Sequence, residues 1–314
     1  MLDVRKLRLL RELAQRGTIA AVAGALNYTP SAVSQQLAAL EHEAGVALLE
    51  RSGRRVVLTA PAIALVEYTE AILEKLEQAS AMLDATRGAL VGPLRIGAFK
   101  SAVCTILPAA LIALGDAHPA LELMITELDP AAVPNALRRG DVDVALVHEY
   151  DCVPVTPAPW FEVEPLLEET VYLASGPLSA PSPDAGAGAD ANAGAGGDPI
   201  LRGRGARWIV GSPDTLCHTM ALRLCEAAGF TPDIRHHADD FATVLALVAA
   251  GQGVALVPRL GAVDPPAGVV LTPLRARRRT GIAVRPGRGG DPAVAAFAAA
   301  MRSSTADWLD RTGS

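Results

Sequence analysis

Apolar residues in the first 60 positions recur with a helical period in three consecutive segments. The first segment lies between Asp3, a residue type that caps helix starts, and Gly17, a residue type common just past helix ends. The second begins after Thr18 and is mostly Ala and Gly, whose small side chains let another helix cross closely. A third begins at Thr29-Pro30. Together they predict a helix-turn-helix domain whose third helix contacts DNA.

The third helix separates an apolar face from a polar one. Val33, Leu37 and Leu40 recur at i, i+4 and i+7 and predict the buried face. The opposite face is small, polar and uncharged, which suits base edges because hydroxyl and carboxamide groups read hydrogen-bond donors and acceptors. We expect five residues at the start and on this face of the helix to bind DNA: Thr29, Pro30, Ser31, Ser34 and Gln35.

A short basic segment follows Gly45 and then alternates through Val56-Val57-Leu58. This pattern predicts a β-wing. Its arginines, Arg51, Arg54 and Arg55, are suited to phosphates or to a minor groove.

A long helix is expected from about Pro61 to Gly88. Two heptad series offset by four include Leu65 with Ile72, and Leu76 with Leu83. Such interleaved series predict a coiled-coil seam through which two copies dimerise. The alternative is a helix that packs on its own domain.

From Leu94 onward, apolar strands alternate with helices, including one continuous helix expected at 101–114. This order predicts a mostly parallel sheet with helices on both faces, so the chain is an α/β multidomain protein. Residues 176–205 are rich in Ala and Gly and lack the large apolar groups that offset chain entropy. We expect a flexible loop there, and an expendable insertion is favoured over a functional lid.

The segments together resemble the LysR-type transcriptional regulators. The matching residues of the head are Ala23, Leu26, Ala32-Val33-Ser34, Leu40-Glu41, Gly45, Leu48, Arg51 and Leu58-Thr59. The matching phrases of the body are RGDVDVALV at 139–147 and LVAAGQGVALVP at 247–258. Leu49 stands where Phe is usual in the family, and Ala60-Pro61-Ala62 stands where Glu-Ala-Gly is usual.

The resemblance implies three parts. These are a winged helix-turn-helix DNA-binding domain at 1–59, a linker (dimerisation) helix at 60–90, and a two-lobed periplasmic-binding-protein-like (type 2) effector domain at 91–314. Lobe I is expected at about 93–162 and 266–314, and lobe II at about 163–265.

Ligands of open α/β folds collect at the carboxyl ends of strands, beside helix N-termini. In lobe I this position holds Phe99, Lys100 and Ser101, and in lobe II it holds Ser212 and Thr215. The resemblance extends an effector site to further walls that include Asp129, Asp240 and Phe241. Each hydroxyl is equally well explained as an ordinary helix cap. The charge of Lys100 favours an anionic effector.

Charge is unevenly distributed in this 314-residue chain of net charge −6. Up to Ala60 there are eight basic and five acidic residues, against twenty and twenty-nine in the remainder. A basic head on an acidic body fits a DNA-binding domain joined to another function. No apolar run is long enough for a membrane span and the N-terminus is charged, so we expect a cytoplasmic protein that does not bind membranes.

Catalytic, metal and cofactor sites are not expected. Ser101, Cys104, His218 and Asp240 lack a nucleophile elbow, and the paired carboxylates at 168–169 and 239–240 are typical of solvated faces. No cysteine spacing or His cluster indicates a metal site, and no glycine motif indicates a nucleotide.

The sequence therefore predicts a sequence-specific transcriptional regulator whose DNA binding is modulated by a small-molecule effector between two lobes. Its expected partners are double-stranded DNA with a pseudo-palindromic operator, a second copy in a dimer or tetramer, and RNA polymerase. An alternative of the same architecture is a redox-responsive regulator acting through Cys104, Cys217 or Cys225. A metabolic enzyme with a DNA-binding-like head is a third hypothesis.

Overall fold

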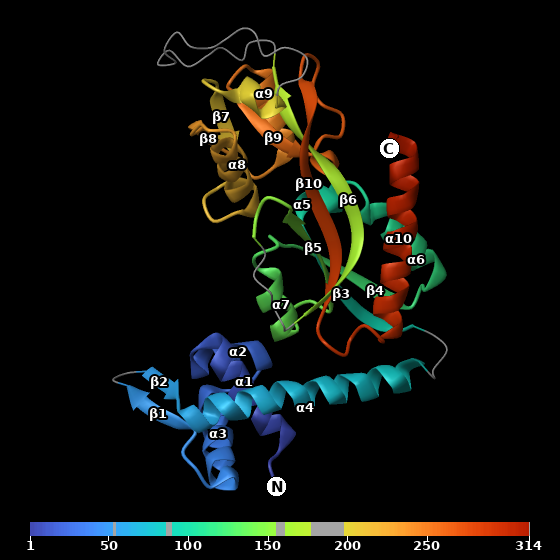
Figure 1. Cartoon of the computed structure of the whole chain (residues 1–314). Helices are drawn as coiled ribbons and strands as arrows, with labels where there is room; N and C mark the ends of the chain where they lie inside the picture. The colour runs from blue at the N-terminus through green and yellow to red at the C-terminus, as the bar shows by residue number, and fades with distance from the viewer. Residues whose placement is uncertain (53–54, 86–89, 155–160, 177–197, 314) are drawn as a thin grey trace. The chain divides into compact units, whose positions relative to one another are not determined.

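The computed structural model describes residues 1–52, 55–85, 90–154, 161–176 and 198–313 (Figure 1). The chain divides into two compact units, which are described separately. The N-terminal unit comprises residues 1–88 and 286–291, and the C-terminal unit comprises residues 89–285 and 292–314. No helix within the described residues is both long and apolar enough to cross a membrane.

The N-terminal unit contains three short helices, a two-stranded wing and one long helix. In chain order these are α1 (Val4–Arg16), α2 (Ile19–Leu26), α3 (Pro30–Ala44), β1 (Leu49–Ser52), β2 (Arg55–Leu58) and α4 (Ala60–Ala85). The capping residues set the boundaries as the sequence predicts. Asp3 accepts a hydrogen bond from the backbone N–H of Arg5, and Gly17 ends α1 with φ at 74°.

The core of this unit is formed by the apolar faces of its helices. Leu7 and Leu10 of α1 pack with Val33, Leu37 and Leu40 of α3, and all five are buried. Each such side chain contributes about 1.5–3 kcal/mol relative to exposure. The apolar face of α3 is therefore committed to the core, which leaves the opposite face to solvent.

The C-terminal unit is built on one eight-stranded sheet in the order β4-β3-β5-β10-β6-β9-β7-β8. Its strands are β3 (Gly92–Ala98), β4 (Leu121–Glu127), β5 (Val144–Tyr150), β6 (Glu162–Ser175), β7 (Arg207–Val210), β8 (Asp233–His237), β9 (Val254–Pro258) and β10 (Val270–Val284). Its helices are α5 (Lys100–Cys104), α6 (Leu107–Ala117), α7 (Val133–Arg139), α8 (Leu216–Ala227), α9 (Phe241–Ala249) and α10 (Pro292–Thr312), with 3-10 turns η1 (Pro199–Gly203) and η2 (Arg259–Gly261).

The sheet is less parallel than the sequence predicts. Its two ends, β4-β3-β5 and β9-β7-β8, are parallel, but β10 is antiparallel to both β5 and β6, and β6 is antiparallel to β9. Figure 1 shows β6 and β10 running side by side through the middle of the unit. These two long strands join two parallel α/β halves, each with its own core cluster.

One local expectation is wrong, and a second falls largely outside the described residues. The single helix expected at 101–114 is two helices, α5 and α6, separated at Thr105-Ile106. Pro108 accounts for the break, because its ring would clash with the carbonyl of Cys104 and it has no N–H to donate. Of the loop expected at 176–205, residues 177–197 lie outside the described residues, and η1 occupies part of the remainder.

Candidate functional site

The outer face of α3 carries the residues predicted to contact DNA. Pro30, Ser31, Ser34 and Gln35 are all exposed. Thr29 caps the helix, because its hydroxyl accepts a hydrogen bond from the backbone N–H of Ala32 at 3.2 Å. All five predicted residues are therefore exposed to solvent, and the hydroxyl of Thr29 also has a helix-capping contact.

The wing is attached to α3 by a partly buried contact. One carboxylate oxygen of Glu41 accepts hydrogen bonds from the backbone N–H groups of Leu48 and Leu49, both at 2.9 Å. The backbones of Arg51 and Arg55 lie in β1 and β2, respectively, while Arg54 lies outside the described residues.

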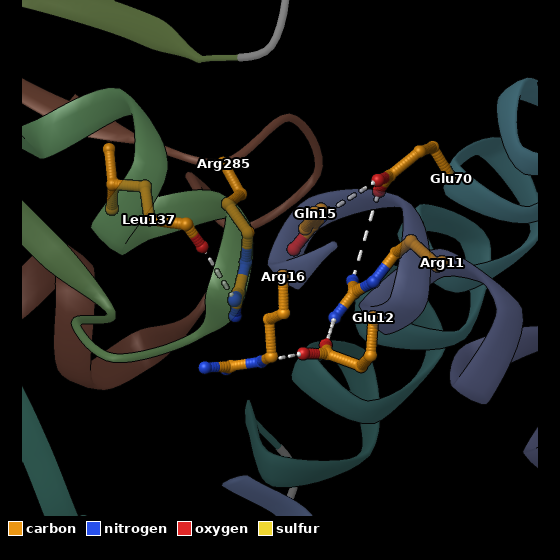
Figure 2. A network of polar contacts seen from close by, with 7 residues as sticks. All are labelled: Arg11, Glu12, Gln15, Arg16, Glu70, Leu137 and Arg285. Carbon is orange, nitrogen blue, oxygen red and sulfur yellow. Dashed lines mark hydrogen bonds and ion pairs between the residues drawn. The ribbon is translucent and has the colours of Figure 1, made fainter. Parts of the chain in front are cut away.

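A polar network joins α1 to the long helix α4, and Figure 2 shows its members. Glu12 is 1% exposed and bonds to Arg11 and to Arg16, the latter at 2.7 Å. Gln15 donates to Glu70 of α4 at 3.1 Å, and Arg11 lies 3.8 Å from the same carboxylate. Burial alone would raise the pKa of Glu12, but the two arginines hold it below its ordinary value. This network fixes the first half of α4 against α1.

Figure 2 also draws a contact that belongs to the C-terminal unit alone. The guanidinium of Arg285, just after β10, donates to the carbonyl oxygen of Leu137 at 3.0 Å. That carbonyl lies in the last turn of α7, where it also accepts from the backbone N–H of the capping Gly140 at 3.0 Å.

The residues predicted to dimerise are distributed along α4. Leu65 is half-buried and packs against the core of the N-terminal unit. Ile72 is 39% exposed, Leu76 48% and Leu83 56%, so these three present apolar surface to solvent in the single chain.

A cavity of about 640 Å³ lies in the C-terminal unit, where α5, α8 and α9 begin. Seven of the eight predicted effector-binding residues line it: Phe99, Lys100, Ser101, Asp129, Thr215, Asp240 and Phe241. Ser212 does not line the cavity. Its N–H and its hydroxyl both donate to Asp239, at 2.7 and 2.6 Å, so it fixes the loop behind the wall.

The base of the cavity holds a buried ion pair that the sequence analysis missed. Arg278 of β10 is completely buried and donates through Nε to Glu169 of β6 at 2.7 Å. It also donates through Nη2 to the hydroxyl of Ser101 at 3.1 Å, and it lies over the ring of Phe99. The second carboxylate oxygen of Glu169 accepts from the N–H of Leu260 at 2.6 Å. The pair therefore holds four elements together beneath the cavity.

Strand register explains this pair. Arg278 lies opposite Glu169 in the antiparallel ladder, and Arg279 lies opposite Glu168. Because successive side chains point to opposite faces, the first pair is buried and the second, at 3.0 Å, is half-exposed. The expectation that Glu169 is a solvated charge is wrong.

His148 of β5 is a second residue missed by the sequence analysis. Its ring lines the cavity and contacts Phe99 edge-on at 4.6 Å between centroids. Both ring nitrogens are buried, and neither has a hydrogen-bond partner within the described residues. Burial, reinforced by the charge of Arg278, holds the pKa of His148 well below its ordinary value, so the ring is neutral near pH 7.

The mouth of the cavity has an ion pair between its two walls. Lys100 Nζ lies 3.4 Å from an oxygen of Asp240. The other oxygen of Asp240 caps α9 by accepting from the N–H and the hydroxyl of Thr243, at 3.2 and 2.8 Å. Burial alone would raise the pKa of Asp240, but these hydrogen bonds and the charge of Lys100 keep it lowered.

Comparison with known proteins places these features in a family. Residues 4–62 match the family described as the bacterial regulatory helix-turn-helix proteins of the lysR family, and residues 87–306 match the LysR substrate binding domain. The chain is 27% identical over 320 residues to the probable HTH-type transcriptional regulator LrrA of Synechococcus elongatus, covering 99% of this chain and 100% of that protein. It is 28% identical over 296 residues to the DNA-binding transcriptional dual regulator OxyR of Escherichia coli, covering 91% and 90%.

Solved structures show the same fold. Full-length OxyR of Pseudomonas aeruginosa matches with a TM-score of 0.66 and 22% identity, covering 96% of this chain and 95% of that one. Full-length CbnR in complex with its target DNA matches with a TM-score of 0.51 and 23% identity, covering 96% and 100%.

Proposed function

Because this chain belongs to the LysR family of DNA-binding transcriptional regulators and carries both the helix-turn-helix and the effector-binding domain, we propose how each part acts. The α3 face made by Ser31, Ser34 and Gln35 reads bases in a major groove, and the wing arginines contact the DNA backbone or a minor groove. The observation that carries this assignment is the division of α3 into a fully buried apolar face and an exposed, uncharged polar one.

DNA is read by paired heads in this proposal. Ile72, Leu76 and Leu83 leave apolar surface on α4 that a second copy would cover, as the heptad spacing predicts. A two-fold pair sets its recognition helices about one turn of DNA apart, so the operator is pseudo-palindromic. The assembly is a dimer or a tetramer. It acts in the cytoplasm, at promoters where it influences RNA polymerase.

The effector occupies the 640 Å³ cavity of the C-terminal unit, a volume within the usual range for small-molecule sites. Binding there favours one arrangement of the two α/β halves over another and so changes how the assembly contacts DNA. The ion pair with Asp240 compensates the charge of Lys100. The reason for expecting an anionic effector is therefore weakened.

A redox mechanism through cysteine has less support from the thiols themselves. Burial raises the pKa of Cys152 and Cys217, and it raises that of Cys225 to about 12. Thiols protonated at neutral pH are poor nucleophiles toward peroxide. Cys104 is exposed and lines the cavity, so it is the residue on which a redox response would depend.

The assignment is tested with three single variants and DNA binding measured across a salt series. We expect Gln35→Ala to lower the ratio of operator to non-specific affinity about ten-fold, because a base contact is lost. We expect Arg54→Ala to weaken all DNA and to reduce the salt slope by about one. His42→Ala, at an exposed position in the last turn of α3, is the control and leaves both quantities unchanged.

The reverse pattern, with Gln35→Ala weakening all DNA equally and Arg54→Ala relaxing specificity, would show that the two roles are exchanged. A genome-wide footprint of bound sites provides the independent check. If the sites have no roughly two-fold symmetric halves, the paired-head arrangement is wrong.

A further inference from the structure

The positive side chains that line the effector cavity are already compensated by the protein. Lys100 is paired with Asp240 at the mouth, and Arg278 is paired with Glu169 at the base. These two are the only Lys or Arg residues among the described residues of the lining. Within the described residues, the cavity therefore offers an anionic ligand no positive side chain that lacks a counter-charge.

Negative charge is in surplus in the lining of the same cavity. Four further carboxylates line the cavity, those of Glu127, Asp129, Asp214 and Asp239, and none forms an ion pair with another described residue. The hydrogen bonds that the structure gives them come from neutral donors. Asp129 accepts from the N–H of Ala131 at 2.8 Å, and Asp239 accepts from Ser212. Four negative charges thus remain without a counter-charge.

These carboxylates come from both sides of the cavity. Glu127 ends β4 and Asp129 follows it, whereas Asp214 and Asp239 precede α8 and α9 on the other side. Cys217 lines the same cavity: burial is the main reason its pKa is raised, and Asp129 and Asp239, one from each side, both add to the effect. A cleft lined by one sign of charge concentrates its field and attracts ligands of the opposite sign.

A second observation indicates that a polar ligand group belongs in this cavity. His148 lines the same cavity with both ring nitrogens unpartnered within the described residues. A neutral imidazole has one nitrogen lone pair, which can accept a hydrogen bond from an ammonium or guanidinium group, and one N–H, which can donate to an acceptor. The ring therefore indicates a polar ligand group, and the surplus of carboxylates determines its charge.

The remainder of the lining suits an apolar body. Phe99, Leu128, Phe241, Leu260 and Val263 all face the cavity. The ring of Phe241 lies directly on Gly261, where an added Cβ would be 2.4 Å from its Cδ2 atom, so this aromatic wall is closely supported. Aromatic faces attract organic cations as well as apolar groups.

We propose that the effector of this regulator is an organic cation, a small amine or guanidine with an apolar body. The inference rests on the proposed assignment of this cavity as the effector site. The ammonium or guanidinium group lies among the unpaired carboxylates and His148, and the apolar body lies against the two phenylalanines.

The test measures binding to the purified full chain by titration calorimetry. The first set of probes shares one apolar body and differs in charge: 2-phenylethylamine, 2-phenylethanol and 3-phenylpropionate. Agmatine adds a guanidinium. We expect at least one of the two cations, 2-phenylethylamine or agmatine, to bind at least about ten-fold more tightly than both the alcohol and the acid.

A charge-removing variant then tests the carboxylates. Glu127→Gln/Asp129→Asn/Asp214→Asn keeps shape, because Asn still accepts from the N–H of Ala131 and tolerates the φ of 73° at position 214. Three exposed charges together should account for about a ten-fold loss of cation affinity. Glu122→Gln, on β4 but outside the cavity lining, is the matched control, and thermal unfolding verifies that each variant folds.

Any of three results overturns the proposal. These are tighter binding of 3-phenylpropionate than of both cations, no binding of either cation, and unchanged cation affinity in the triple variant. Operator binding of each variant is measured in parallel without any probe. If the chain binds its operator but binds neither cation, only the proposal that the effector is a cation is contradicted, and the proposed DNA-binding function stands. A response of operator affinity to the acid contradicts the cation while supporting the cavity as the effector site.

Discussion

The polar network of the N-terminal unit and the cavity lining of the C-terminal unit arrange charge differently. In the N-terminal unit, Glu12 is enclosed by Arg11 and Arg16, and a neighbouring contact links α1 to Glu70 of α4. In the C-terminal unit, carboxylates gather around a cavity without positive partners. Charge that is compensated within the chain fixes the position of one element against another. Charge left uncompensated around a cavity is available to a ligand.

The cavity itself contains both kinds of charge. Arg278 and Glu169 form a closed pair at its base, with additional bonds to Ser101 and Leu260. The carboxylates of Glu127, Asp129, Asp214 and Asp239 have no ion pair within the described residues, and the hydrogen bonds they accept come from neutral donors. The comparison therefore predicts large stability effects for the enclosed charges, and binding effects for the unpaired ones.

Removing one member of the enclosed pair at the cavity base should have the largest effect. Glu169→Gln leaves Arg278 buried without its counter-charge, which costs about 3–5 kcal/mol of unfolding free energy. Glu168→Gln, one position away, removes an exposed partner of Arg279 and should cost about 1 kcal/mol or less. Urea unfolding of the two variants measures the difference. Equal losses would show that burial does not separate the two pairs.

In the N-terminal unit, Glu12→Gln should cost about 2 kcal/mol at pH 7, because two charged hydrogen bonds are lost. The pKa of Glu12 in the folded protein lies below its ordinary value of 4.5. Its stabilisation is therefore complete above about pH 4.5 and is lost as the pH falls through the folded-state pKa.

Unfolding followed at pH 7 and again near pH 3 measures this dependence. Glu67→Gln, at an exposed position of α4, is the control and should show little effect at either pH. A Glu12→Gln cost that persists undiminished at low pH would show that packing, rather than charge, accounts for it.

Local features of the sequence were sufficient to predict the elements of the fold. Asp3, Gly17 and Thr29 cap or end helices where their residue types indicate, because capping depends on groups a few residues apart. The strand ends likewise identified four residues that line the cavity, Phe99, Lys100, Ser101 and Thr215, and the family resemblance supplied three more, Asp129, Asp240 and Phe241. The one predicted residue outside the lining, Ser212, donates its N–H and its hydroxyl to Asp239, 27 residues away, so it is neither in the lining nor the helix cap that was the alternative explanation.

Long-range register was beyond the reach of the sequence. Arg278 and Glu169 are 109 residues apart, and each stands beside residues of its own charge that are exposed. Only the pairing of β6 with β10 shows which arginine and which glutamate point inward. The antiparallel centre of the sheet was missed for the same reason, since strand order depends on contacts between distant segments. The surplus of carboxylates becomes visible only after these pairs are identified.

The smallest expected effect concerns Lys100, the residue that first favoured an anionic effector. It is 47% exposed and its pair with Asp240 is solvated, so Lys100→Met should change the free energy of unfolding by about 1 kcal/mol or less. The same variant leaves Asp240 without a counter-charge at the cavity mouth. Affinity for the tighter-binding cation should therefore rise about two- to five-fold, on the scale of one exposed charge. Lys75→Met, on α4, is the control for removal of a lysine elsewhere. Two outcomes would contradict this expectation: weaker cation binding in Lys100→Met, or binding of 3-phenylpropionate to the wild-type chain that is lost in the variant. Either would show that Lys100 binds a ligand anion. The charge at the cavity mouth would then not be compensated by the protein alone.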